Sequence, residues 1–109
     1  MIIEWAVRAR KEFAYWQEQK PDCAARICDL LDDIELHPFT GLGKPEPLGY
    51  EFAGYWSRRI SSEHRLVYRI SGKRGAETCL IAQCRYHYLK KIIQREGPPH
   101  SELIKFSGW

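Results

Sequence analysis

The 109-residue chain lacks any apolar stretch long enough to cross a membrane, and its first residues lack the cationic start and long apolar run of a secretory signal. Its four cysteines occur as Cys23/Cys28 and Cys79/Cys84, with no CxxC motif and no histidine at zinc-ligand spacing beside either pair. The two thiols of either pair cannot meet within one helix or strand, because side chains five residues apart point in different directions in both. We therefore expect a reduced, cytoplasmic protein with no zinc site and no membrane association.

Internal repeats, low-complexity tracts and a phosphate-loop signature are also missing, and the length suits one domain. The charge is small in total but uneven along the chain. Residues 1–53 contain six Lys/Arg against ten Asp/Glu, whereas residues 54–91 contain nine against two. A basic second half favours a polyanionic partner, since cations beside phosphates release condensed counterions. A solvated basic surface has the same composition, so charge alone leaves both interpretations open.

The pattern predicts one strand, two helices and a strand meander. Residues 2–7 are β-prone, and residues 8–19 are good helix formers that end at a Lys20-Pro21 break. The second helix has apolar residues at helical spacing, namely Cys23, Ile27, Leu30, Leu31 and Ile34. Strand-like runs follow at residues 55–60, 63–70 and 77–88. This order predicts an α+β domain, a twisted antiparallel sheet with two N-terminal helices packed on one face.

Residues 38–49 form a segment rich in proline and glycine, for which we expect a turn-rich loop of fixed shape and no regular element. It carries Lys44 and Glu46. Because Pro45 and Pro47 flank Glu46, the backbone that presents this carboxylate is restricted.

The strands carry the groups that complement Glu46. Alternation predicts Gln83, Arg85 and His87 on one face of the last strand, opposite Ala82, Cys84, Tyr86 and Tyr88. Arg65, Val67 and Arg69 share a face of the preceding strand, so Arg65 and His87 are expected on the same side of the sheet. RNA cleavage by its own 2′-hydroxyl needs a base, an acid and a cation for the phosphorane charge. Glu46, His87 and Arg65 provide these groups, and no metal is required.

Other residues offer binding chemistry. Lys44, Arg58 and Arg59 are candidates for flanking phosphates, and Trp56, Tyr55 and Tyr88 for stacking on unpaired bases. Each candidate also has a plainer interpretation. Glu46 also fits a solvated carboxylate without a catalytic role, and His64 and His87 also fit structural histidines. Trp56 also fits packing on a helix or a cation–π contact.

Three runs of residues match a known family: GKPEPL at 43–48, GYWSRRISSEHRLVYRI at 54–70 and CRYHY at 84–88. Trp5, the run Tyr15 to Glu18, and Pro38-Phe39 with Gly41 extend the match to residues 1–88. On these motifs the chain resembles the YoeB/Txe family within the RelE-like toxins.

The resemblance implies a microbial-RNase-like (RelE-like) fold and cleavage of messenger RNA, especially at the ribosomal A site, without a cofactor. By position, Glu46 resembles the family's general base and His87 its general acid, while Arg65 resembles the transition-state cation and Tyr88 an active-site tyrosine. Lys44, Arg58 and Arg59 match neighbouring cationic positions. The implied partners are the ribosome and mRNA, a second copy in a homodimer, and a YefM/Phd-type antitoxin whose acidic, initially disordered segment folds onto the toxin.

Two features depart from the family pattern. Gly49 stands where a lysine is common, which leaves open a catalytically weakened module that only binds the ribosome or an antitoxin. Residues 89–109 continue past the His-Tyr pair at which relatives typically end. We therefore divide the chain into a toxin domain, residues 1–88, and a C-terminal extension of unknown role, residues 89–109, which either covers the site or is harmless. A DNA-binding regulator is disfavoured because the helix from Cys23 to Ile34 is acidic.

Overall fold

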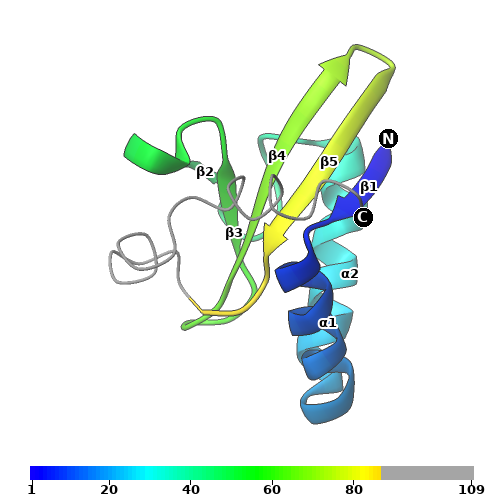
Figure 1. Ribbon diagram of the computed structural model, residues 1–109, viewed down its shortest axis with the longest axis vertical. Coiled ribbons are helices and arrows are strands. Elements are labelled where there is room, and N and C mark those ends of the chain that lie inside the picture. The colour runs from blue at the N-terminus through cyan, green and yellow to red at the C-terminus, as the bar shows by residue number, and fades with distance from the viewer. Residues whose placement is uncertain (87–109) are drawn as a thin grey trace.

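The computed structural model describes residues 1–86 and shows two helices packed on a five-stranded sheet (Figure 1). In chain order the elements are β1 (Ile2–Trp5), α1 (Val7–Gln19), α2 (Pro21–Leu36), β2 (Glu46–Pro47), the 3₁₀ helix η1 (Tyr50–Phe52), β3 (Trp56–Arg59), β4 (Arg65–Lys73) and β5 (Ala76–Gln83). Pro21 opens α2, where its missing N–H has no helical partner to lose. The expected α+β fold and the two N-terminal helices are confirmed. In this part of the chain, neither helix is long and apolar enough to cross a membrane.

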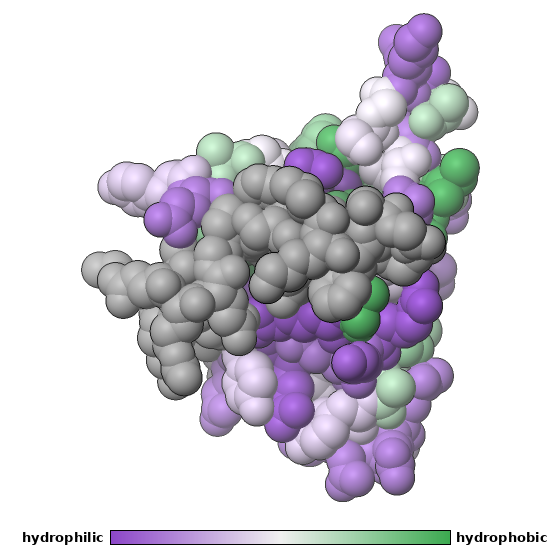
Figure 2. Space-filling model, viewed as in Figure 1, coloured by the Kyte–Doolittle hydropathy of each residue, from purple (hydrophilic) through white to green (hydrophobic). Residues whose placement is uncertain are grey.

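The sheet has the strand order β1-β5-β4-β3-β2. The predicted meander is confirmed, because β3, β4 and β5 pair as antiparallel neighbours. The expectation of a wholly antiparallel sheet is wrong at one edge, where β1 runs parallel to β5. The long stretch of chain between β1 and β5, which begins with both helices, allows this parallel pairing. The β4–β5 hairpin projects at the top of the molecule (Figure 1), and its tip is hydrophilic (purple in Figure 2).

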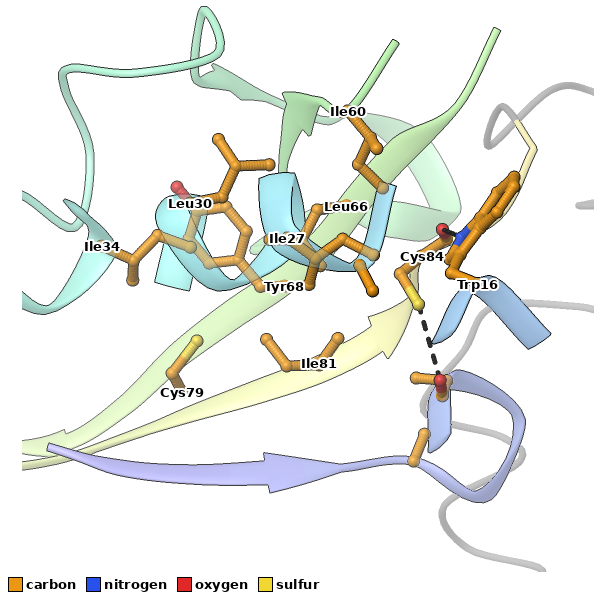
Figure 3. Packing of buried hydrophobic residues seen from close by; sticks show 13 residues of the cluster. Trp16, Ile27, Leu30, Ile34, Ile60, Leu66, Tyr68, Cys79, Ile81 and Cys84 are labelled. Atoms are coloured by element: carbon orange, nitrogen blue, oxygen red, sulfur yellow. Dashed lines mark hydrogen bonds between the residues drawn. The ribbon is translucent and has the colours of Figure 1, made fainter. Parts of the chain in front are cut away.

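The main core lies between the helices and one face of the sheet (Figure 3). The regularly spaced Ile27, Leu30 and Ile34 of α2 are fully buried, as their helical spacing predicts. From the sheet they meet Leu66, Tyr68, Cys79 and Ile81, and from α1 they meet Ala9 and Trp16. All four cysteines are free, and burial raises the pKa of the Cys79 thiol to about 12. Cys79 is therefore a neutral packing residue at physiological pH.

A second, smaller cluster lies on the other face of the sheet and consists of Leu48, Phe52, Tyr55, Val67 and Ala82. No local sequence pattern indicates this cluster, because its members come from a loop, a 3₁₀ turn, the residue before β3 and two separate strands. The loop also contains β2, a two-residue strand that the proline content had argued against. Pro47 is tolerated there because β2 is the edge strand of the sheet.

An irregularity in β5 changes which side chains share a face. Tyr68 pairs with Ile81 and Val67 with Gln83, so β5 contributes one extra residue, Ala82, at a β-bulge. Ala82 belongs to the second cluster, whereas Cys84 belongs to the main core. The predicted shared face of Ala82 and Cys84 is therefore wrong. The strand is also shorter than expected, since it ends at Gln83 within the described residues.

Candidate active site

The sheet face opposite the helices, called the site face below, is assembled from four strands. The strand register aligns Glu46 with Ser57, Ser57 with Val67, and Val67 with Gln83, which makes one row across the sheet. Arg59 pairs with Arg65 on the same face, two residues along from Ser57 and Val67. Because neighbouring strands are about 4.8 Å apart, β2 and β4 lie about 10 Å apart across β3. The site face therefore brings Glu46, Arg59 and Arg65 together.

Arg65 is held by the turn that precedes it. Its Nη1 donates hydrogen bonds to the carbonyl oxygens of Ser61 at 2.8 Å, His64 at 3.1 Å and Ser62 at 3.3 Å. The side chain is half-buried, so the cation is fixed in place while part of it remains accessible. A positive charge held in this way stabilises developing negative charge without having to reorganise.

Lys44 and Glu46 are exposed, and the loop that carries them is fixed at both ends. On one side the backbone N–H of Arg59 donates to the Gly43 carbonyl at 2.7 Å. On the other side the Leu48 N–H donates to the Tyr55 carbonyl at 2.9 Å. Gly43 has a φ of 83°, and a Cβ there would lie 2.8 Å from Leu30 Cδ2, so the loop can approach the core this closely only with glycine.

Arg58 does not join the site face, and the expectation that it contacts phosphate is wrong. Adjacent residues of a strand point to opposite faces, and Arg58 pairs with Leu66 on the helix side while Arg59 faces outward. Arg58 is fully buried, with an ion pair of 2.6 Å from Nη1 to Asp33 Oδ2 and a hydrogen bond of 3.0 Å from Nε to the Tyr68 hydroxyl.

The remaining donors of Arg58 hold the start of the loop. Its two terminal nitrogens also donate to the carbonyl oxygens of His37, Thr40 and Leu42. All five N–H groups of the guanidinium are therefore used inside the protein. Asp33 completes the arrangement by accepting from the Leu42 N–H, and this bond together with Arg58 holds the pKa of Asp33 below its ordinary value.

The aromatic candidates for base stacking also lie elsewhere. Trp56 pairs with Tyr68 on the helix side, where it packs against the main core and its ring centroid lies 4.9 Å from that of Phe39. Tyr55 does lie toward the site face but is buried in the second cluster, edge-on to Phe52. Neither ring is therefore open on the site face, which corrects the base-stacking expectation for Trp56 and Tyr55.

The chain that follows β5 is tied to α1. The Cys84 N–H donates to Glu12 Oε1 at 2.8 Å, and the Trp16 indole donates to the Cys84 carbonyl at 2.8 Å. The Arg85 guanidinium lies 3.6 Å from the centroid of the Tyr15 ring. Gln83 and Arg85 therefore do not form the polar face that was expected for them together with His87. Gln83 is buried beside Val67, and Arg85 stacks on Tyr15 of α1.

His64 fixes the last described residue, a contact that no signal in the sequence indicated. The Tyr86 N–H donates to His64 Nδ1 at 2.7 Å, and the His64 ring packs edge-on against Trp16 at 4.7 Å. Since the Arg65 N–H donates to the Tyr86 carbonyl at 3.2 Å, the chain reaches position 86 beside Arg65.

His87, Tyr88 and the extension at residues 89–109 lie outside the described residues. Within residues 1–86, no three His, Cys, Asp or Glu side chains are grouped so as to hold a metal ion.

Comparisons with known proteins agree on one family. The family model for YoeB-like toxins of bacterial type II toxin-antitoxin systems matches residues 5–88. Toxin YoeB of Escherichia coli K12 is 43% identical over 88 residues, which cover 81% of this chain and 100% of the relative.

Solved structures give the same result. A YoeB/ParE toxin from Agrobacterium tumefaciens superposes with a TM-score of 0.77 at 43% identity, over 81% of this chain and all of the other. The YoeB–YefM complex from Staphylococcus aureus contains a chain that superposes with a TM-score of 0.72 at 36% identity, over 81% of this chain and 98% of the other. A YoeB dimer from the same organism gives a TM-score of 0.73.

Proposed function

Since the chain belongs to the YoeB-like toxins of bacterial type II toxin-antitoxin systems, we propose that it is an endoribonuclease that cuts mRNA at the ribosomal A site. Cutting the message in the decoding site inhibits translation, and the protein acts in the cytoplasm, where ribosomes are. The observation that carries the proposal is the shared face of Glu46 and Arg65, a carboxylate and a fixed cation separated by one strand.

The reaction is an acid–base transesterification that needs no cofactor. Glu46 takes the proton of the 2′-hydroxyl, and the 2′-oxygen attacks the adjacent phosphorus. Arg65 stabilises the negative charge of the five-coordinate phosphorane. As the bond to the 5′-oxygen breaks, His87 protonates that leaving group, so the products are a 2′,3′-cyclic phosphate and a 5′-hydroxyl end.

Neighbouring residues position the RNA. Arg59 is exposed beside Arg65 on the site face, and Lys44 is exposed beside Glu46 in the same loop. We assign both to the phosphates that flank the cleaved bond, as such contacts align an RNA without reading its sequence. Tyr88 is assigned to the active site by its position next to His87 in the family motif. Arg58 has no part in this assignment, because its donors are already used.

The partners follow from the family. The S. aureus YoeB is solved both as a dimer and in complex with YefM. We extend both properties to this chain: it forms homodimers and is inhibited by a YefM-type antitoxin.

The decisive experiment is primer extension on mRNA in a reconstituted translation system. Wild-type protein is expected to create new 5′ ends at A-site codons, and Glu46→Gln and His87→Gln are each expected to lose about 10²–10⁴-fold in rate. The matched control is Glu51→Gln, an exposed carboxylate in η1 outside the Glu46 row, which should cut normally. Normal cutting by Glu46→Gln overturns the assignment of the base. Translation arrest by the wild type without new 5′ ends would contradict the nuclease and support a protein that inhibits translation by binding alone.

A further inference from the structure

Arg69 is a cation on the site face that the proposed mechanism does not use. It lies in β4 two residues beyond Val67 and pairs with Leu80, so it projects on the same side as Arg65. Its guanidinium carbon lies 5.1 Å from the centroid of the buried Tyr55 ring, and the side chain is half-buried. The ring of Tyr55 therefore fixes this cation in place.

The charge of Arg69 has no protein counter-charge among residues 1–86. No carboxylate or carbonyl of these residues forms an ion pair or hydrogen bond with its guanidinium, and its Nε is buried without a hydrogen-bond partner. Its neighbours on the site face are the apolar Leu80, which pairs with it in β5, and Tyr55, which belongs to the second cluster. Tyr55 is a neutral phenol, since burial raises its pKa. A partly desolvated cation without a partner is costly, and an incoming anion relieves that cost.

The spacing along β4 relates this cation to the proposed reaction centre. Arg65 and Arg69 are four residues apart on one strand, which corresponds to about 13 Å. That distance exceeds one step between successive phosphates, so the two arginines meet different phosphates of one strand. We propose that Arg69 is a second phosphate-binding residue for single-stranded RNA, a few nucleotides away from the phosphate that Arg65 contacts. The inference rests on the proposed nuclease function and extends the RNA path along β4.

The test is equilibrium binding of a single-stranded 2′-O-methyl RNA oligonucleotide, which cannot be cleaved, to the full chain at several salt concentrations. Losing one phosphate contact lowers the slope of log K against log salt by about 0.7 for a single strand. Arg69→Gln is expected to show that decrease together with several-fold weaker binding at low salt. Arg69→Lys, which keeps the charge, is expected to restore most of the slope.

The matched control is Arg74→Gln, which removes an exposed arginine at the tip of the β4–β5 hairpin (Figure 1). It is expected to bind with the affinity and slope of the wild type. Shortening the oligonucleotide from one end should at some length abolish the difference between Arg69→Gln and wild type. Thermal unfolding separates a binding defect from a folding defect, because Arg69→Gln removes the unpaired charge and is expected to be at least as stable as the wild type.

The second phosphate site is overturned if Arg69→Gln keeps the wild-type salt slope, or if Arg74→Gln lowers the slope equally. These outcomes are distinct from failure of the nuclease. A wild type that binds the oligonucleotide with an Arg69-dependent slope but never cuts mRNA overturns the proposed reaction and leaves this site standing.

Discussion

Arg58 and Arg59 are neighbours of the same residue type with opposite roles. The pleat of β3 turns Arg58 inward, where it binds Asp33 and three loop carbonyls, and turns Arg59 outward onto the site face. A buried guanidinium is stable here because each of its donors has an acceptor. Arg58 therefore shapes the loop that presents Lys44 and Glu46 without touching a substrate.

Arg58→Met is expected to lower the free energy of unfolding by about 1–3 kcal/mol, because it leaves the carbonyl oxygens of the loop without their donor. Arg59→Met, on the exposed face of the same strand, should change it by no more than about 0.5 kcal/mol. Urea unfolding of both variants measures the difference. Equal losses would show that Arg58 is not the residue that anchors the loop.

Asp33 makes stability depend on pH in a defined direction. The Leu42 N–H and Arg58 lower the pKa of Asp33 in the folded state relative to the unfolded chain, for which the ordinary value is about 3.9. The stabilisation is therefore fully present above that value and is lost as pH falls through the lowered pKa.

Asp33→Asn tests this pH dependence. The wild type should be more stable than Asp33→Asn at neutral pH, and the difference should shrink below about pH 4. Urea midpoints across an acid series measure it. A difference that is constant down to the acid end would contradict the role of the ionised carboxylate.

At the scale of elements, the end of β5 is held by side chains from α1 and from the β3–β4 turn. Glu12 and Trp16 bind the two backbone groups of Cys84, and His64 accepts the N–H of Tyr86, whose φ of 66° is unusual for a residue other than glycine. These hydrogen bonds hold the backbone of Tyr86, the residue before His87. We expect His64 to be a positioning residue for that segment.

His64→Ala should accelerate hydrogen exchange of the Tyr86 amide by up to about tenfold, since one hydrogen bond of about 1 kcal/mol is lost. His64→Asn should restore slow exchange, because its side-chain oxygen can replace Nδ1 as the acceptor. The Arg59 amide, which donates to Gly43, serves as an internal control. Unchanged Tyr86 exchange in His64→Ala would refute this role.

At the scale of the whole molecule, the sheet is covered on both faces, by the helices on one side and by the second cluster over part of the other. A chain ending at Tyr88 keeps every described member of both clusters and is therefore expected to unfold cooperatively.

Urea unfolding compares the two lengths, and a large loss on shortening would show that residues 89–109 contribute to stability. The mRNA assay adds a functional comparison. Cutting by the shortened chain alone would make residues 89–109 an inhibitor, and equal cutting by both would make them dispensable.

Local patterns in the sequence were sufficient for β1, both helices and the β3–β5 meander, but not for β2 or η1. The apolar spacing of Ile27, Leu30 and Ile34 predicts α2, because a helix buries residues on the same face every three or four positions. Short turn-forming segments predict the β3–β5 meander in the same way. Loop and strand patterns made Glu46 and Arg65 candidate site residues, and motifs such as GKPEPL then indicated the family and the roles that it implies for them.

Only the tertiary structure decided which side chains face each other. Strand pairing turns Arg58 toward the helices. The extra residue at Ala82 places Ala82 and Cys84 on different faces, and the long connection between β1 and β5 allows them to pair in parallel. The second cluster and the loop anchored by Arg58 join residues distant in sequence. The physical reason is that a local pattern determines how often side chains return to the same face of an element, whereas contacts between elements determine which face is buried. A shift of one residue in strand register exchanges the buried and exposed faces.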